Sequence, residues 1–165
     1  MAFSIVPTTV GLAKLAAATA GTPLALTQMV LGDANGVPYE PTGGESALVN
    51  QVYLGGLNAL MPDPTDATRT LAELVVPFDA GPFIVREIGL LDAAGDLIFI
   101  GNYPLSEKTV AGSGAARELI VRAVLPVSPT SDIVLLIDPT ILLATQDWVR
   151  RLVGGPARRF FFAQL

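Results

Sequence analysis

Three segments in the middle of the chain alternate apolar with other side chains, and this pattern restricts the fold more than any other feature of the sequence. The segments are residues 71–78, 83–92 and 117–127. A period of two places every second side chain on one face of a strand, which is typical of a sheet with one face in the core. The side chains expected to share these faces are Ala72, Leu74, Val76 and Phe78, then Ile84, Ile88 and Leu90, then Leu119, Val121, Ala123 and Leu125.

A helix is expected near the start of the chain. Thr8 or Thr9 is suited to cap its first turn, because a hydroxyl oxygen can accept a hydrogen bond from a free backbone N–H there. Gly21 and Pro23 then end it. The residues that recur at helical spacing are Leu12, Leu15, Ala16 and Thr19.

The remaining patterns complete an α+β domain. Residues 92–96 have the chemistry of a tight turn with Gly95 in the left-handed region, which predicts a hairpin of residues 83–92 and 96–103. Residues 34–45 are rich in Gly and Pro and are expected to form a loop. Further strands are expected at residues 1–6, 24–31, 52–60 and 132–138. The predicted fold class is α+β: a mixed, mainly antiparallel β-sheet domain with an N-terminal helix and a short C-terminal helix.

The chain lacks two residue types on which much enzyme chemistry depends. Its 165 residues include no His and no Cys, which excludes Ser-His and Cys-His nucleophiles, His-ligated metals and disulfides. Carboxylates such as Asp92, Asp96 and Glu107 could serve a glycosidase, but Asp92 and Asp96 fit turn positions, where Asp bonds the backbone. The loop near Asp33 lacks the ligand spacing of a calcium site. We therefore expect no catalytic residue, no metal and no cofactor.

Arg86 and Glu87 interrupt an otherwise apolar strand. Charges in half-buried strands are normally paired, so we interpret both as structural charges satisfied inside the sheet rather than as a ligand site. In a regular strand the two side chains point to opposite faces. The expected partners of Arg86 are therefore Glu118 or Glu73 on neighbouring strands.

Charge is divided unequally along the chain. Residues 1–149 hold six basic and all fifteen acidic residues, a net charge of −9, whereas residues 150–165 carry a net charge of +4. The overall charge of −5 has the wrong sign for a general nucleic-acid binder. The longest uncharged run, residues 15–32, contains several polar residues, so no membrane insertion is expected. Charged residues make up only 15% of the chain, against about 25% in an average domain, which favours a surface covered by partners.

The end of the chain is predicted to make protein contacts. Thr145 is suited to cap a short helix through Val153, with an apolar stripe too short to persist without packing on something else. A Gly/Pro hinge and a basic-aromatic tail follow, and three exposed Phe side chains would promote aggregation unless covered. The sequence leaves two alternatives open: this cluster packs on its own chain, or it docks on another chain. The candidate interaction residues are Trp148, Val149, Leu152, Val153, Arg158, Arg159, Phe160, Phe161, Phe162 and Leu165.

Several short blocks, in order and with similar spacing from about residue 5 to residue 153, resemble the phage tail-collar fibre family. The family contains the amino-terminal modules of tail fibres in contractile-tailed phages and R-type pyocins. Where its members commonly have a Gly-Gly-Trp-Trp-like stretch, this chain has Gly81, Pro82 and Phe83. The blocks are Gly32-Asp33, Val52-Tyr53, Leu57 to Leu60, Ala72 to Pro77, Arg86 to Leu90, Asp92 with Gly95, Asn102 to Pro104, and Ala144 to Val149.

The resemblance implies a non-enzymatic virion structural protein: a short tail fibre or a fibre adaptor that docks on the baseplate of a contractile tail. It implies synthesis in the host cytoplasm, location in the virion tail, a homotrimer, contacts with baseplate proteins and a downstream fibre protein as a further partner. The organisation expected is an attachment domain at 1–143, a helix at 144–153 and the hinge and tail at 154–165.

Family members continue for hundreds of residues. This chain is therefore expected to supply docking rather than a fibre shaft or receptor-binding tip. The alternative function is a receptor-binding or carbohydrate-binding tail module.

Overall fold

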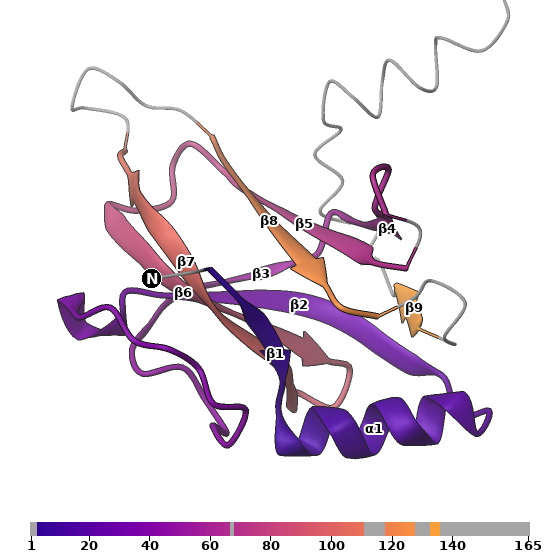
Figure 1. Cartoon of the computed structure of the whole chain (residues 1–165). Coiled ribbons are helices and arrows are strands. Elements are labelled where there is room, and N and C mark those ends of the chain that lie inside the picture. Colours follow the sequence, from indigo (N-terminus) through magenta and orange to yellow (C-terminus); the bar gives the residue numbers. More distant parts are fainter. Residues whose placement is uncertain (1–2, 67, 111–117, 128–132, 136–165) are drawn as a thin grey trace, which may run out of the picture.

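Two mainly antiparallel sheets face each other across one apolar core in the computed structural model of the chain (Figure 1). The structure describes residues 3–66, 68–110, 118–127 and 133–135. Sheet A has the order β1-β7-β6-β2-β3, with β9 parallel to β2, and sheet B has the order β4-β5-β8. The elements are β1 (Ile5–Pro7), α1 (Thr9–Thr19), β2 (Leu24–Gly32), the 3-10 turn η1 (Ala34–Gly36), β3 (Gln51–Gly56), β4 (Ala59–Pro62), β5 (Thr70–Val76), β6 (Phe83–Asp92), β7 (Leu97–Lys108), β8 (Leu119–Leu125) and β9 (Ile133–Leu135).

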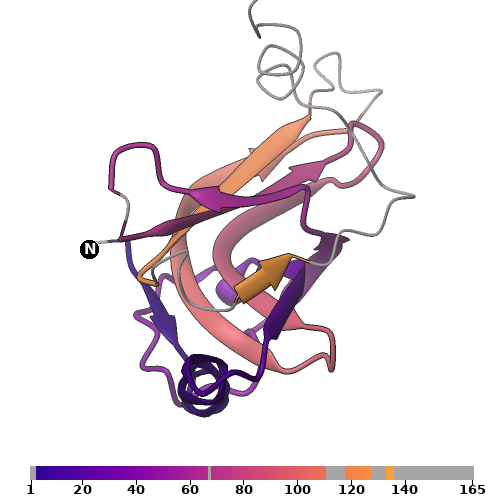
Figure 2. The same ribbon diagram turned by 90° about the vertical axis from the view of Figure 1, so that its right-hand side faces the viewer.

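The mainly antiparallel sheet and the N-terminal helix predicted from the sequence are both confirmed. Helix α1 lies along one end of the sheets and is seen end-on in Figure 2. The predicted C-terminal helix, the hinge and the tail lie outside the described residues, so they and the division at residues 143 and 153 stay predictions. In the part of the chain that the structure describes, no helix is long and apolar enough to cross a membrane.

The core lies where the alternating segments predicted it. On the inner face of sheet B, Ala72, Leu74 and Val76 of β5 lie beside Val121 and Ala123 of the neighbouring strand β8, and all are buried. Sheet A contributes a second layer to the same core, which includes Leu26, Met29, Leu31, Ile88, Leu90 and Phe99. Burial of each such side chain contributes about 1.5–3 kcal/mol, so this apolar contact between the sheets holds the domain together.

Two side chains were assigned to the wrong face because strands end or bulge. Pro77 follows the last residue of β5, and Phe78 lies beyond the strand with its side chain 56% exposed. In β6 the pairing register with β7 shifts between Val85 and Glu87. This bulge puts Val85 in the core with Ile88 and leaves Ile84 only half-buried.

The strand predicted at residues 52–60 is two strands in different sheets. Leu57 is buried in the core, and its N–H donates to the carbonyl of Thr27 in sheet A. The next residue, Asn58, donates its N–H to Glu73 of sheet B. The chain therefore crosses from one sheet to the other between these residues, a break that the local apolar pattern does not show.

Helix α1 packs on sheet A through a glycine. The Thr8 hydroxyl oxygen accepts a hydrogen bond from the Gly11 N–H at 2.9 Å, as expected of an N-cap. A Cβ atom added at Gly11 would lie 2.0 Å from the carbonyl oxygen of Ile98 in β7. Only a glycine allows the helix and the strand to approach this closely.

An ion pair cluster connects the same helix to the β6–β7 turn. Lys14 contacts the carboxylates of both Asp92 and Asp96, the second at 2.6 Å, and hydrogen bonds to them raise its pKa. Burial alone would raise the pKa of Asp92, but bonds from Lys14 and from backbone N–H groups outweigh it and lower the pKa. Asp92 also accepts from the N–H groups of Ala94 and Asp96. This confirms its predicted role in the turn, with Gly95 at a φ of 86°.

Replacement of Gly11 by alanine is expected to destabilise the domain. Because the new methyl group would meet the Ile98 backbone, the helix must shift, and overpacking of this kind costs about 1–3 kcal/mol. Thermal unfolding should occur at least about 2 °C lower. The matched control is Gly44→Ala, where the added carbon meets only the Thr42 hydroxyl oxygen at 3.5 Å. Equal melting temperatures for the two variants would contradict the close packing.

Candidate functional site

Glu87 is a carboxylate with no exposed surface, held on the face of sheet A that points away from sheet B. Its Oε1 accepts hydrogen bonds from the N–H groups of Ala34 at 3.1 Å and Asn50 at 2.9 Å. Its Oε2 accepts from the N–H of Val49 at 3.0 Å. Three backbone donors thus satisfy the charge, as buried carboxylates require. Glu87 thereby fixes two separate loop segments, which we call the Glu87 platform: residues 33–37 and 48–50.

The first segment of the platform has an unusual backbone conformation. Ala34 and Asn35 have φ values of 51° and 50°, and Gly36 follows at 79°. A left-handed alanine is unfavourable by about 1–2 kcal/mol, so the surroundings must hold it in place. Glu87 does so through the Ala34 N–H, and the Asp33 carboxylate does so through the Asn35 N–H at 2.9 Å.

The two segments of the platform are also joined directly. Asp33 accepts a hydrogen bond from the Asn50 side chain at 2.8 Å and donates its own N–H to the Asn50 carbonyl at 3.1 Å. At Gly32 an added Cβ would lie 2.3 Å from Glu87 Oε1 and 2.6 Å from the Asn50 carbonyl oxygen. The absence of a side chain at Gly32 therefore gives the carboxylate and the second segment room to meet.

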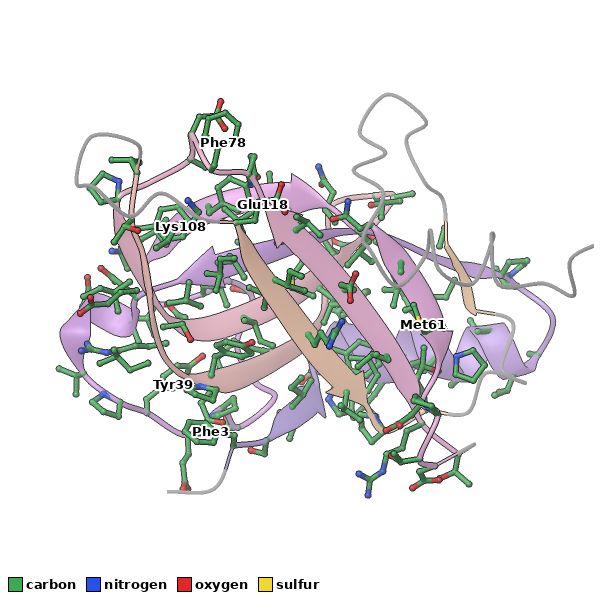
Figure 3. The ribbon with its side chains drawn as sticks, turned by 90° about the horizontal axis from the view of Figure 1, so that it is seen from above. Phe3, Tyr39, Met61, Phe78, Lys108 and Glu118 are labelled. Atoms are coloured by element: carbon green, nitrogen blue, oxygen red, sulfur yellow. The ribbon has the colours of Figure 1, made fainter. Side chains whose placement is uncertain are left out.

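Asn102 attaches the loop that follows the platform to sheet A. Its side chain accepts from the Ser4 N–H at 2.8 Å and donates to the Tyr39 carbonyl at 3.3 Å. The hydroxyl of Tyr39 is buried with no hydrogen-bond partner among the described residues, and burial together with the charge of Glu87 raises its pKa. Figure 3 shows Tyr39 close to Phe3, the first described residue. A small cluster of Val30, Leu97 and Ile100 lies beneath this loop.

The outer surface of the platform is apolar with one cation beside it. Val37 is 65% exposed and Val49 is 51% exposed. The guanidinium of Arg86 lies below Gly36, 3.5 Å from where a Cβ would be. Among the described residues Arg86 forms no ion pair, and its expected partner Glu73 instead bonds Arg122 at 2.8 Å. The interpretation of Glu87 as a satisfied structural charge is confirmed. The expected pairing of Arg86 is wrong, because neither Glu73 nor Glu118 forms an ion pair with it.

Glu87 holds the backbone of the platform in place. Three backbone N–H groups donate to Glu87, so the carboxylate is engaged in holding the two loop segments. Within the described ranges no cluster of three or more acidic side chains could hold a metal ion. The interaction residues predicted at the end of the chain, from Trp148 to Leu165, lie outside the described residues and stay predictions. The platform was missed because its two segments are remote in sequence, and the only signal was a charged pair inside an apolar strand.

Three blocks that carry the family resemblance meet at this site. Gly32-Asp33 begins the platform, Glu87 fixes it, Asn102 attaches the adjoining loop, and Gly89 lies over Leu97 and Leu48 beneath it. The model of the family described as "Phage tail-collar fibre protein, N-terminal" matches residues 1–147. The chain belongs to the tail-collar fibre family. Phe83, at the departure from the family pattern, stacks on Tyr53 with ring centroids 5.6 Å apart.

A tail-collar relative shows the same relationship over most of the chain. The "Probable tail fiber protein" of Escherichia phage P2 is 40% identical over 149 residues, which are 89% of this chain and 22% of that protein. The chain thus spans about a fifth of the length of the relative it matches. No solved structure matches this chain. Family and relative together support a structural role in the virion tail.

Replacement of Glu87 by glutamine is expected to loosen the platform. The amide has one acceptor oxygen in place of two and turns an NH₂ group toward backbone donors, leaving at least one buried N–H unpaired. The free energy of unfolding should fall by about 2 kcal/mol, which lowers the melting temperature by about 4–8 °C. Hydrogen exchange should accelerate at the amides of Ala34, Val49 and Asn50. The exposed Glu40→Gln is the control, and unchanged exchange at all three amides in the Glu87 variant would contradict the assignment.

Proposed function

We propose that this tail-collar protein is an attachment subunit that docks on the baseplate of a contractile phage tail through the Glu87 platform. The observation that carries the proposal is the strained loop held by a buried carboxylate. A surface already fixed in one conformation loses less entropy on binding than a mobile loop does. Exposed Val37 and Val49 supply apolar contact, and Arg86 supplies a cation for an acidic group of the partner.

The proposal also makes the protein structural rather than enzymatic. Several of its carboxylates are engaged in local turns: Asp63 accepts from the Thr65 N–H at 2.8 Å and Asp66 from the Thr68 N–H at 3.0 Å. Asp92 is occupied by Lys14 and by its own turn. A glycosidase would need two carboxylates free to act as acid and base on a bound sugar.

Docking is tested by introducing charge on the platform surface. Val37→Asp combined with Val49→Asp removes apolar contact and sets two negative charges at the interface, which should reduce the copies of this chain per particle at least about tenfold. Mass spectrometry of purified particles, referenced to baseplate proteins, measures the copy number. The control is Val10→Asp, an exposed valine on α1. Normal incorporation of the platform variant, with normal melting of the free protein, would contradict docking at this surface.

We further propose that the protein assembles as a homotrimer that a downstream fibre protein can join. The low charged fraction, the apolar stripe predicted at Trp148 to Val153 and the family resemblance support this assembly. Light scattering of the full chain, whose monomer mass is 17.2 kDa, should report three copies. A monomer over a hundredfold range of concentration would contradict the trimer.

A further inference from the structure

One corner of the sandwich leaves two strand edges facing a slot. Strand β7 pairs with β6 as far as Lys108, but on its other edge β1 pairs with it only from Phe99 to Gly101. The outer edge of β7 from Leu105 to Lys108 therefore faces no other strand among the described residues. Strand β8 is the last strand of sheet B, so one of its edges is also without a paired strand in the described part of the chain.

The slot between these edges has a volume of about 390 Å³. Its lining residues are Leu105, Ser106, Glu107, Lys108, Thr109, Glu118 and Leu119. Glu107 and Glu118 are exposed, and Leu105 is 57% exposed. Lys108 at the end of β7 and Glu118 just before β8 both line the slot, and both are labelled in Figure 3. The slot thus combines backbone edges, an apolar side chain and two carboxylates.

The cation in the slot does not neutralise this acidic rim. Lys108 is buried, and its ammonium donates to the carbonyl oxygens of Thr109 at 2.9 Å and Phe78 at 3.4 Å. No ion pair joins it to Glu107 or Glu118. Among the described residues neither carboxylate forms an ion pair, which suits both to a basic partner.

We propose that this slot accepts an extended segment by strand addition, and that the occupant is the basic-aromatic segment 157–165 of another copy of this chain. Addition of a strand satisfies edge N–H and C=O groups, and side-chain chemistry sets the choice of segment. Arg158 and Arg159 complement Glu107 and Glu118 in sign and number. The inference rests on the proposed assembly of several copies and adds to it the place where one copy holds the next.

The alternating apolar residues of segment 157–165 also suit a strand at the edge of the sandwich. In an extended conformation Phe161, Ala163 and Leu165 share one face, an apolar set suited to point inward. The half-buried Leu119 of β8, which packs against the core, lines the slot. An edge strand rich in apolar residues and without Pro, as β8 is, needs protection from uncontrolled pairing. An occupied slot would provide it.

The absence of cysteine makes a disulfide test direct. Two full-length variants, Ser106→Cys in the slot and Ala163→Cys in the segment, are mixed after one has been given a mass tag, and are then oxidised mildly. The expected product is a tagged–untagged pair at more than about five times the yield obtained when Ser46→Cys replaces the slot variant. Ser46 is exposed and lies in a loop away from the slot, so it is a matched control.

Charge reversal is the second part of the cross-linking test. Glu107→Lys with Glu118→Lys in the slot variant should lower the cross-linked yield about three- to tenfold, because two exposed pairs become repulsive. Arg158→Glu with Arg159→Glu in the segment variant should restore it. A free peptide of residues 157–165 should compete with the cross-link.

The outcomes separate this inference from the proposed trimer. A trimer by light scattering with cross-linking no better than the Ser46 control would overturn the slot assignment alone. A Ser106→Cys/Ala163→Cys double variant that cross-links only within one chain would show the segment on its own domain and overturn the exchange between copies. A monomer that forms no mixed cross-link would overturn both.

Discussion

The buried carboxylate of Glu87 is the interaction on which the outer layer of this domain depends. A charge removed from water is tolerated only where donors replace the water, and here three backbone N–H groups from two loop segments do so. The bond to Ala34 holds this residue in a left-handed conformation that is unfavourable for alanine, and Asp33 holds Asn35 in the same region. One side chain therefore fixes both segments of the Glu87 platform, next to the cluster of Val30, Leu97 and Ile100.

Close backbone approach is the second constraint, and it operates on both sides of sheet A. Gly11 lets α1 contact the Ile98 carbonyl, and Gly32 leaves space for Glu87 and the Asn50 carbonyl. Neither position tolerates a side chain without a shift of backbone. Since helix and platform are both fixed on sheet A, the sandwich offers rigid surfaces, as the proposed attachment role requires.

Most of the helices, strands and turns could be predicted because they depend on local chemistry. The Thr8 cap, the Asp92–Gly95 turn and the alternating core residues of β5 and β8 depend on neighbours within a few positions, so the sequence alone shows them. The predictions that were wrong depend on contacts between residues far apart in the sequence. The bulge after Val85 shifts by one residue which side chains of β6 point into the core. The crossing after Leu57 occurs because Leu57 bonds to sheet A and Asn58 bonds to sheet B. Neither depends on local propensity.

The sequence by itself determined the β-rich class, the helix at the start, the absence of His and Cys chemistry and the membership of the tail-collar family. It also indicated that Glu87 must be satisfied internally, because a charge within an apolar strand has no other stable state. Only the tertiary structure decided which groups satisfy it. The donors at Ala34, Val49 and Asn50 lie 53, 38 and 37 residues away, and such pairings follow from how strands are ordered in the sheet rather than from any pattern along the chain.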